Sequence, residues 1–486
     1  MTYKAPGVYI EEIPLFPPSV AEVETAIPAF MGYTLTATKD GATITEPLKI
    51  SSLIEFEKYF GKAPKSNALA TVKVTEDPLV VKDNNDPNNI KYEKHVAYKV
   101  ELIPAEAISY SILYYAIRMF YENGGGNCYI ASVGVAENKV PKVEAFTAAL
   151  EKIRNLDEPT ILVAPEAAYL DQNDYKSFYQ AMIKQASDLK DRVVIVDPIY
   201  TKKLDINVDI KAFRENIDGD REDLRYAASY YPWLYTSVKY EYDADEIVFA
   251  KDSKILTDDK LGDDLDGEKL SKVKLTHNLL YEQVKSELDK SFRVTLPPSS
   301  TMAGVYASVD NERGVWKAPA NVVLKSVVSP AIQISRFQQD DMNVDTEGTK
   351  SINAIRTIPG KGVAVWGART MDGNDKEWRY INVRRFFNMV EESIQKSTIW
   401  AVFEPNTKNT WVKVKGMIES YLLVKWIEGA LAGSKPEEAF FVKVGIPETM
   451  NSDDVLEGKM IVKVGMAVSR PAEFIIIQFT HKQQTS

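Results

Sequence analysis

The sequence predicts a multidomain protein of mixed class, with an α/β middle part and a smaller α+β part toward the carboxyl-terminal end. Three observations lead to this prediction. The chain has 486 residues, enough for about three domains, because single hydrophobic cores rarely exceed roughly 250 residues. Short apolar segments alternate with helical periodicity between residues 105 and 235. A strand-like segment also lies near each end of the chain, and the C-terminal one is an almost unbroken apolar run.

A buried strand over residues 26–33 and a helix over residues 51–60 open the α/β part. The helix is bounded by Ser51 or Ser52, which are good N-cap residues, and by Gly61, which favours its end. These short signals predict the first strand–helix pair of the middle domain.

Helices and short apolar strands then follow one another in turn, which is typical of a parallel sheet covered on both faces. The predicted helices and strands are, in chain order, helix 105–123, strand 128–135, helix 143–153, strand 160–165, helix 174–190, strand 192–198 and strand 227–235. The three glycines 124–126 come between a helix and a strand. A phosphate-binding loop has the opposite order, so we predict that these glycines end the helix.

Two segments interrupt this alternation and predict insertions, one over about residues 70–102 and one over about residues 240–296. The first is rich in alternating β-formers around the turn-forming residues 83–89. The second contains the Asp- and Gly-rich residues 257–269, which we interpret as a mobile loop, because they lack the regular ligand spacing of an EF-hand. The α/β part resumes near Pro297.

The C-terminal part predicts helices over residues 383–395 and 410–431 and strands over residues 439–444 and 459–468. Residues 371–486 hold 15 basic and 15 acidic residues, so the acidic excess of the whole chain lies before them.

Both ends of the chain carry strand-like segments that are unusually apolar for termini. Residues 8–13 follow a Pro-Gly breaker and precede three prolines at positions 14, 17 and 18, which predict a stiff, extended link. Residues 471–483 contain a nearly continuous apolar strand. Two such strands at the free ends of one chain suggest donation of strands to other molecules.

Composition excludes several classes of protein. A net charge of −10 argues against a general nucleic-acid binder. One cysteine, Cys128, excludes an internal disulfide framework, and three scattered histidines offer no zinc-ligand pair. We also expect neither a signal peptide nor a membrane-spanning segment, which predicts folding in a cytoplasm.

Several motifs, taken together and in order, resemble the contractile phage tail sheath family. They are APGVYIEEI (5–13), PPSVAEVETAIPAFMGYT (17–34), GVWKAPAN (314–321), PGKGVAVWGART (359–370), YINVRRFF (380–387), VFEPN (402–406), WIEGALAG (426–433) and PAEFI (471–475). The resemblance covers both ends and much of the middle. Within the family it points to the sheath of a phage-tail-like, extracellular contractile injection system, with the sheath of a true contractile phage as the alternative.

The resemblance implies a fold and a function. It implies a strand arm with a linker over residues 1–25 and a subtilisin-like α/β middle domain with the two insertions over residues 26–358. An inner C-terminal α+β domain over residues 359–470, completed by strands from neighbouring subunits, and a final arm over residues 471–486 follow. It implies a structural subunit that stacks as hexameric rings around an inner tube and contracts to drive this tube through a target envelope.

The resemblance also implies partners and a location. The expected partners are further copies of the chain, the inner tube protein, and baseplate and terminal cap proteins, with no nucleic acid and no direct membrane insertion. No cofactor, metal or enzymatic activity is expected. Assembly is expected in a bacterial cytoplasm, followed by release in an extracellular particle or virion tail.

Two sets of residues are expected to form contacts between subunits. The strand arms are carried by Val8, Tyr9, Ile10, Phe474, Ile475, Ile476 and Ile477. Contact with the inner tube is predicted around Lys425, Glu428, Ser434 and Lys435, because exposed charge suits a weak and breakable contact.

An alternative of another class is a subtilisin-like hydrolase. Asp197 follows the apolar strand RVVIV, and the segment PSSTMAG (298–304) faintly resembles the serine-bearing segment of subtilisins. Thr301 occupies the place of the nucleophile, however, and the intervening His277 lies in the second insertion. A serine hydrolase needs a histidine that takes the nucleophile's proton, so the sequence disfavours catalysis.

Overall fold

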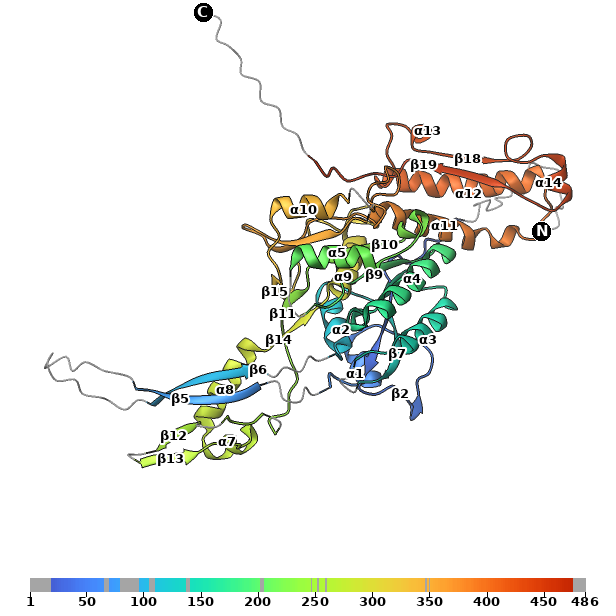
Figure 1. Ribbon diagram of the computed structural model, residues 1–486. Helices are drawn as coiled ribbons and strands as arrows, with labels where there is room; N and C mark the ends of the chain where they lie inside the picture. Colours follow the sequence, from blue (N-terminus) through green and yellow to red (C-terminus); the bar gives the residue numbers. More distant parts are fainter. Residues whose placement is uncertain are drawn as a thin grey trace, which may run out of the picture. The chain divides into compact units, whose positions relative to one another are not determined.

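The computed structural model of the protein describes most of the chain, and its internal packing forms two compact units (Figure 1). The described residues are 19–64, 70–78, 96–104, 110–136, 140–201, 205–245, 247–250, 253–257, 260–345, 348 and 350–474. The larger unit comprises residues 26–308 and 319–381, and the smaller unit comprises residues 1–25, 309–318 and 382–486.

The larger unit is built on an eight-stranded sheet with the order β17-β16-β10-β9-β8-β1-β7-β4. Its strands are β1 Pro28–Thr34, β4 Leu48–Ile50, β7 Cys128–Val135, β8 Ile161–Val163, β9 Val193–Val196, β10 Ala227–Tyr231, β16 Asn353–Ile358 and β17 Gly362–Val365. The strands from β16 to β7 are parallel, whereas β17 and β4 join the two edges antiparallel. The predicted α/β class of this part is therefore confirmed.

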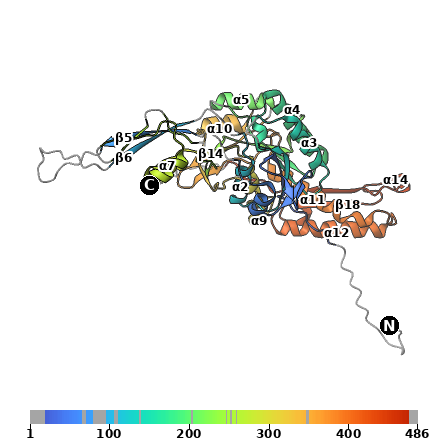
Figure 2. The same ribbon diagram turned by 90° about the horizontal axis from the view of Figure 1, so that it is seen from below.

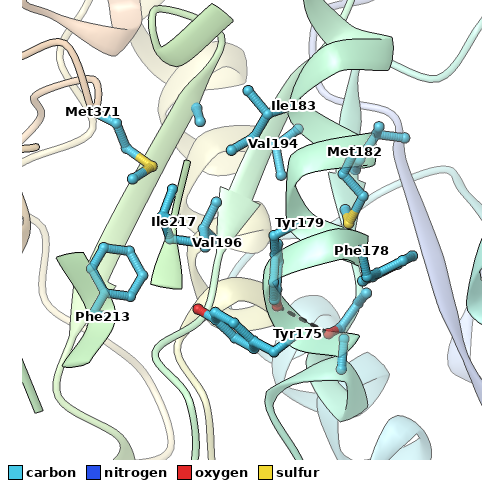
Figure 3. Close-up of a cluster of buried hydrophobic side chains, with 14 of the residues drawn as sticks. Tyr175, Phe178, Tyr179, Met182, Ile183, Val194, Val196, Phe213, Ile217 and Met371 are labelled. Carbon is cyan, nitrogen blue, oxygen red and sulfur yellow. Dashed lines mark hydrogen bonds between the residues drawn. The ribbon is translucent and has the colours of Figure 1, made fainter. Parts of the chain in front are cut away.

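Helices cover both faces of this sheet. Successive residues of a strand point to opposite faces, so each strand contributes side chains to the contacts on both faces. Ala29 and Met31 of β1 share a core with residues of α3 Val143–Arg154 and α4 Gln172–Leu189. Phe30 instead makes an edge-to-face contact with Phe120 of α2 Leu113–Glu122, with ring centroids 5.2 Å apart. On the first face, Figure 3 shows α4 side chains packed beside Val194 and Val196 of β9.

On the second face, α2 packs closely against α9 Ser299–Arg313, a helix that the sequence did not predict. A Cβ atom added to Gly304 of α9 would lie 2.5 Å from the carbonyl oxygen of Phe120, so the two backbones approach closely only because residue 304 is glycine. Helix α2 ends at Glu122 with Asn123 as its C-cap, and the next residue, Gly124, has a φ of +101°, which favours glycine. The predicted helix-terminating role of glycines 124–126 is confirmed.

The remaining elements of the larger unit connect the strands of the sheet. The predicted caps of α1 Leu53–Phe60 are confirmed, since the Ser52 side chain accepts from the Glu55 N–H and Gly61 has a φ of +77°. Further elements are β2 Thr38–Lys39, β3 Ala42–Thr43, η1 Pro165–Tyr169, α5 Ile206–Asn216, α6 Arg221–Leu224 and α10 Arg336–Asn343.

The strand predicted over residues 227–235 is two strands in different sheets. β10 ends before Pro232, which has no N–H for a sheet ladder, and β11 Leu234–Lys239 then pairs with β14 Arg293–Leu296 and β15 Val327–Pro330. The apolar character of the segment continues through this break because β10 is buried throughout and Trp233 and Leu234 are buried after it, so the pattern alone concealed it.

The two predicted insertions pack together around one hydrophobic core. β5 Ala70–Pro78 and β6 Val96–Pro104 belong to the first, and β12 Lys254–Thr257, β13 Lys260–Asp264, α7 Leu270–Thr276 and α8 Asn278–Ser291 to the second. Val72 and Val74 share a core with Phe249, Leu270 and Val284. The interpretation of residues 257–269 as a loop was wrong, because Lys260–Asp264 forms a hairpin strand with β12.

The smaller unit contains the C-terminal helices and strands, and their predicted types are confirmed. They are α11 Ile381–Ser397, η2 Ile399–Ala401, α12 Lys408–Ile427, α13 Pro436–Ala439, β18 Phe440–Val444, α14 Ser452–Leu456 and β19 Val462–Met466. Figures 1 and 2 both show β18 running alongside α12.

The boundary between the units differs from the one predicted after residue 358. Residues 359–381 belong with the larger unit, because β17 pairs antiparallel with β16 at the edge of the large sheet. Residues 309–318 at the end of α9 belong with the smaller unit. The expected boundary therefore falls inside a sheet, where periodicity gives no signal for a change of unit.

Candidate assembly site

The most conspicuous surface of the smaller unit is a two-stranded antiparallel sheet of β18 and β19. Val442 pairs with Val464 on the face turned toward α12, and Val442 is buried. Phe441 lies on the other face, where half of its side chain is exposed. A sheet of two strands is marginal by itself, and each outer edge presents unpaired backbone groups that another strand could join.

Helix α12 supports this sheet through an apolar face. Val414, Met417, Ile418 and Leu422 are buried on it. Near the start of the helix, the Trp411 ring lies under Gly445, where an added Cβ would be 3.2 Å away. Helix α12 thus covers the inner face of the sheet, whereas the edges and the outer face remain open among the described residues.

The chain leaves this sheet toward its C-terminal end along a short backbone ladder. Leu431 and Val468 form an isolated antiparallel bridge, and the Ser469 N–H donates to the Ala430 carbonyl oxygen at 2.9 Å. Phe474, the last described residue, is 71% exposed. The other predicted arm residues, Val8, Tyr9, Ile10, Ile475, Ile476 and Ile477, lie outside the described residues.

The segment that follows the amino-terminal arm is fixed to α11; we name residues 19–25 the strap. The Ala21 N–H donates to Ser397 Oγ at 3.0 Å, and the Val23 N–H donates to Ser393 Oγ at 3.1 Å. Alternate strap residues therefore meet residues four apart on one face of a helix. These two bonds fix the register of the strap along α11.

A buried ion pair anchors the end of the strap. Arg385 of α11 donates to both carboxylate oxygens of Asp310 in α9, at 3.0 and 2.5 Å, and to the Thr25 carbonyl oxygen at 2.9 Å. The Thr25 hydroxyl also donates to Asp310, at 2.6 Å. The two charged side chains are 3% and 6% exposed, so their charges are compensated by each other rather than by water.

The structure corrects the prediction for Lys425. This side chain is only 7% exposed and forms ion pairs with Glu428, at 2.8 Å, and with Glu22 of the strap. Its ammonium also lies 5.5 Å from the centroid of the Trp316 ring. Lys425 is therefore an internal link between α12 and the strap, because its long apolar stem allows burial when the head group is paired. Glu428, Ser434 and Lys435 are exposed.

The segments with a faint resemblance to a hydrolase form a buried polar cap. Asp197 follows β9 and accepts from the backbone N–H of Ser299 at 2.8 Å and from the Ser299 hydroxyl. Thr301 is completely buried, and its hydroxyl has no hydrogen-bond partner among the described residues. His277 lies between α7 and α8, where its ring contacts Thr276 at 3.0 Å. Asp197 thus caps α9, and burial raises its pKa to about 7.

A second buried carboxylate, which the sequence analysis missed, caps α2. Glu166 follows β8 and accepts from three backbone N–H groups, those of Tyr33 at 2.6 Å, Ile112 at 2.7 Å and Leu113 at 2.9 Å. Burial raises the pKa of this completely enclosed carboxyl to about 8, although the three donors favour its charged form. The only sequence signal is a glutamate placed between apolar residues, in LVAPEAA.

The described residues contain no group of three or more His, Cys, Asp or Glu side chains that could hold a metal ion. Among them, no helix combines the length and the apolar character that crossing a membrane requires.

Comparison with known proteins relates the chain to tail sheaths. Residues 373–482 match the family described as "Phage tail sheath C-terminal domain". The whole fold resembles the sheath complex of an extracellular contractile injection system, PVC, in its contracted state, with a TM-score of 0.63 and 29% identity over 99% of both chains. The chain is thus similar to contractile tail sheath proteins over nearly its whole length.

Other sheath proteins match this chain over different extents. The contracted helical sheath of the anti-feeding prophage (AFP) has a TM-score of 0.63 and 29% identity, over 99% of this chain and 100% of that chain. The tail sheath protein of Enterobacteria phage T4 is 28% identical over 26% of this chain. A prophage major tail sheath protein of Pseudomonas aeruginosa strain UCBPP-PA14 is 25% identical over 36% of this chain.

The alignments with these two curated relatives span less than half of each relative. They cover 44% of the Pseudomonas protein and 19% of the T4 protein. The likeness to the two injection-system sheaths, in contrast, extends over nearly the full length of each chain.

Proposed function

We propose that the protein is the structural subunit of a contractile sheath, which polymerises as stacked hexameric rings around an inner tube and contracts to drive this tube through a target envelope. The observation that carries this proposal is the likeness to contracted injection-system sheaths over 99% of the chain. This extent favours an injection system over a true phage, because the T4 match covers 26% of the chain.

Subunits are joined by exchange of their terminal strands. The open edges of the β18–β19 sheet support this step, because added strands would satisfy unpaired backbone groups. The described ends of the chain, the strap and Phe474, also belong to the same unit as this sheet. Burying the apolar side chains of one arm contributes on the order of 10 kcal/mol, which roughly offsets the entropy of ordering it, so many arms acting together stabilise the assembly.

We expect the full-length chain to form long ribbed tubes, and a variant that lacks residues 1–18 to remain monomeric, because the truncation removes one exchanged strand. Negative-stain microscopy of both samples measures this. The strap and its anchors remain in the truncated variant, so its circular dichroism should match that of the full chain. Monomers or small closed oligomers from both chains would contradict strand-linked assembly.

The middle domain is proposed to have a subtilisin-like topology without enzymatic activity. The support lies at the ends of β9 and α9, where Asp197 is paired with Ser299 and Thr301 is buried. A hydrolytic site needs an accessible nucleophile next to a general base. Both side chains instead complete the packing at the start of a helix.

The inner tube is proposed to meet the loop that contains Glu428, Ser434 and Lys435, now without Lys425. We expect charge reversal in Lys435→Glu to weaken co-assembly with the tube protein, because a polar contact of this kind depends on complementary charge. Co-sedimentation of sheath and tube proteins measures the effect, with Lys408→Glu on an exposed position at the start of α12 as the control. Unchanged co-sedimentation of the Lys435 variant would exclude this loop.

The remaining partners and the location follow from the same proposal. Sheath rings are expected to start on baseplate proteins and to end at a terminal cap protein, without nucleic acid and without direct membrane insertion. Subunits would assemble in the bacterial cytoplasm and leave it within an extracellular particle or a virion tail.

A further inference from the structure

The outer face of the β18–β19 sheet carries two lysines that oppose each other directly. Lys443 of β18 pairs in register with Lys463 of β19, and both side chains are exposed. Phe441 lies two residues before Lys443 on the same face, and the Lys443 ammonium is 5.5 Å from the centroid of its ring. Among the described residues, neither lysine has a carboxylate within ion-pair distance.

Such a pair is unfavourable in a free subunit. Directly opposed side chains on one face of an antiparallel pair have Cβ atoms about 5 Å apart, and like charges at this spacing destabilise the sheet. A carboxylate that approaches both ammonium groups offsets the repulsion between them. The surface therefore fits an acidic partner that reaches the outer face of the sheet from one of its open edges.

We propose that Lys443 and Lys463 bind Glu11 of a second copy of this chain, and that this contact sets the register in which the amino-terminal segment joins the β18–β19 sheet. The proposal rests on the sheath function above and adds the residues that determine which strand is accepted and how it is aligned.

Alternation along the arm selects Glu11. In a strand, Val8, Ile10 and, at its end, Glu12 share one face, whereas Tyr9 and Glu11 share the other. If Val8 and Ile10 pack on the apolar inner face of the sheet, against α12, Glu11 must point to the outer face, where Lys443 and Lys463 lie. The arm at the other end carries one acidic residue, Glu473, which lies before the apolar strand rather than within it.

The test is a charge swap in the full-length chain. The double variant Lys443→Glu, Lys463→Glu keeps a like-charged pair in the sheet but repels Glu11, so we expect its critical concentration for tube formation to rise at least about tenfold. Adding Glu11→Lys should restore assembly to within about threefold of wild type, because the ionic contact re-forms with the charges exchanged. Sedimentation and microscopy measure tube formation.

Two matched variants separate register from net charge. Glu12→Lys, added in place of Glu11→Lys, should not restore assembly, because residue 12 points to the opposite face. Lys413→Glu alters an exposed lysine of α12 and should leave tube formation unchanged. Rescue by Glu12→Lys to the same extent as by Glu11→Lys would overturn the proposed register.

A third measurement uses the free subunit. Lys463→Glu places opposite charges across the strand pair, so we expect a higher melting temperature for the truncated chain that lacks residues 1–18, together with weaker assembly of the full chain. Lower stability of the truncated variant would contradict the opposition of the two lysines.

The outcomes keep the two proposals apart. Wild-type tubes with unimpaired assembly of the double lysine variant would overturn this inference and leave the sheath function intact. Loss of tubes without rescue by Glu11→Lys would also overturn it and would point to an acidic surface of another protein. The absence of tubes from the wild-type chain would contradict the sheath function itself.

Discussion

Replacement of Glu166 by alanine is expected to lower the free energy of unfolding by at least about 3 kcal/mol, because it leaves three enclosed backbone N–H groups without an acceptor, at about 1–3 kcal/mol each. These donors join β1 and the start of α2 to the end of β8, so one side chain connects three elements. Chemical denaturation measures the loss. Glu158→Ala is the control, since Glu158 is half exposed in its pair with Lys49 and should change stability by less than about 1 kcal/mol.

The same carboxyl predicts the direction of a pH effect. Its pKa is about 8 in the folded protein, compared with an ordinary value of 4.5, so the folded state holds a proton that the unfolded chain releases. The free energy of unfolding should therefore fall as the pH rises from about 4.5 to about 8. Glu166→Gln, which cannot titrate, should flatten part of this slope. An unchanged slope, or a stability that increases over this interval, would contradict the burial of an ionisable group at this place.

Replacement of Arg385 by alanine is the second large effect that we expect, a loss of about 3–5 kcal/mol. The substitution leaves the Asp310 carboxylate buried without its compensating charge, and it removes the bond to the Thr25 carbonyl oxygen. Chemical denaturation of the variant chain measures the loss in the free energy of unfolding. Hydrogen exchange at Ala21 and Val23 reports whether the strap has come away from α11, which a merely local loss of packing would not cause.

Two variants on the same elements control this experiment. Lys396→Ala removes a pair with Glu392 on α11 in which the lysine is 44% exposed, and it should cost less than Arg385→Ala. The double variant Arg385→Met, Asp310→Leu replaces both charges with apolar groups of similar length and should recover most of the loss. Equal losses of stability for Lys396→Ala and Arg385→Ala would contradict a larger stabilising contribution from the buried pair of Arg385 and Asp310.

Local chemistry allowed much of the secondary structure to be predicted. Ser52 and Gly61 bound α1 as expected, because capping depends on residues within one turn of the helix end. The glycines after α2 likewise end that helix, since a positive φ favours glycine at any place in a fold. Predictions failed where the signal was not local, as at Pro232, where one apolar run supplies strands to two sheets.

The candidate site was predicted in outline only. The apolar arms stay a prediction from composition and alternation, because all their residues except Phe474 lie outside the described residues, whereas Lys425 was expected on the surface and is buried. Its partners, Glu22 and Trp316, lie 403 and 109 residues away in the sequence, which no periodicity reveals. Glu166 was missed for the same reason, because its three donors come from β1 and the start of α2.

Neighbouring residues and motifs contiguous in the chain were enough to predict the fold class and the order of most elements. Which distant groups meet depends on the tertiary structure. It joined the two insertions in one core, divided the chain inside α9 rather than after residue 358, and fixed the strap to α11. It also brought Lys443 opposite Lys463. Ion pairs, caps and strand register arise between residues far apart in the chain, so their energies depend on a fold that a local pattern does not specify.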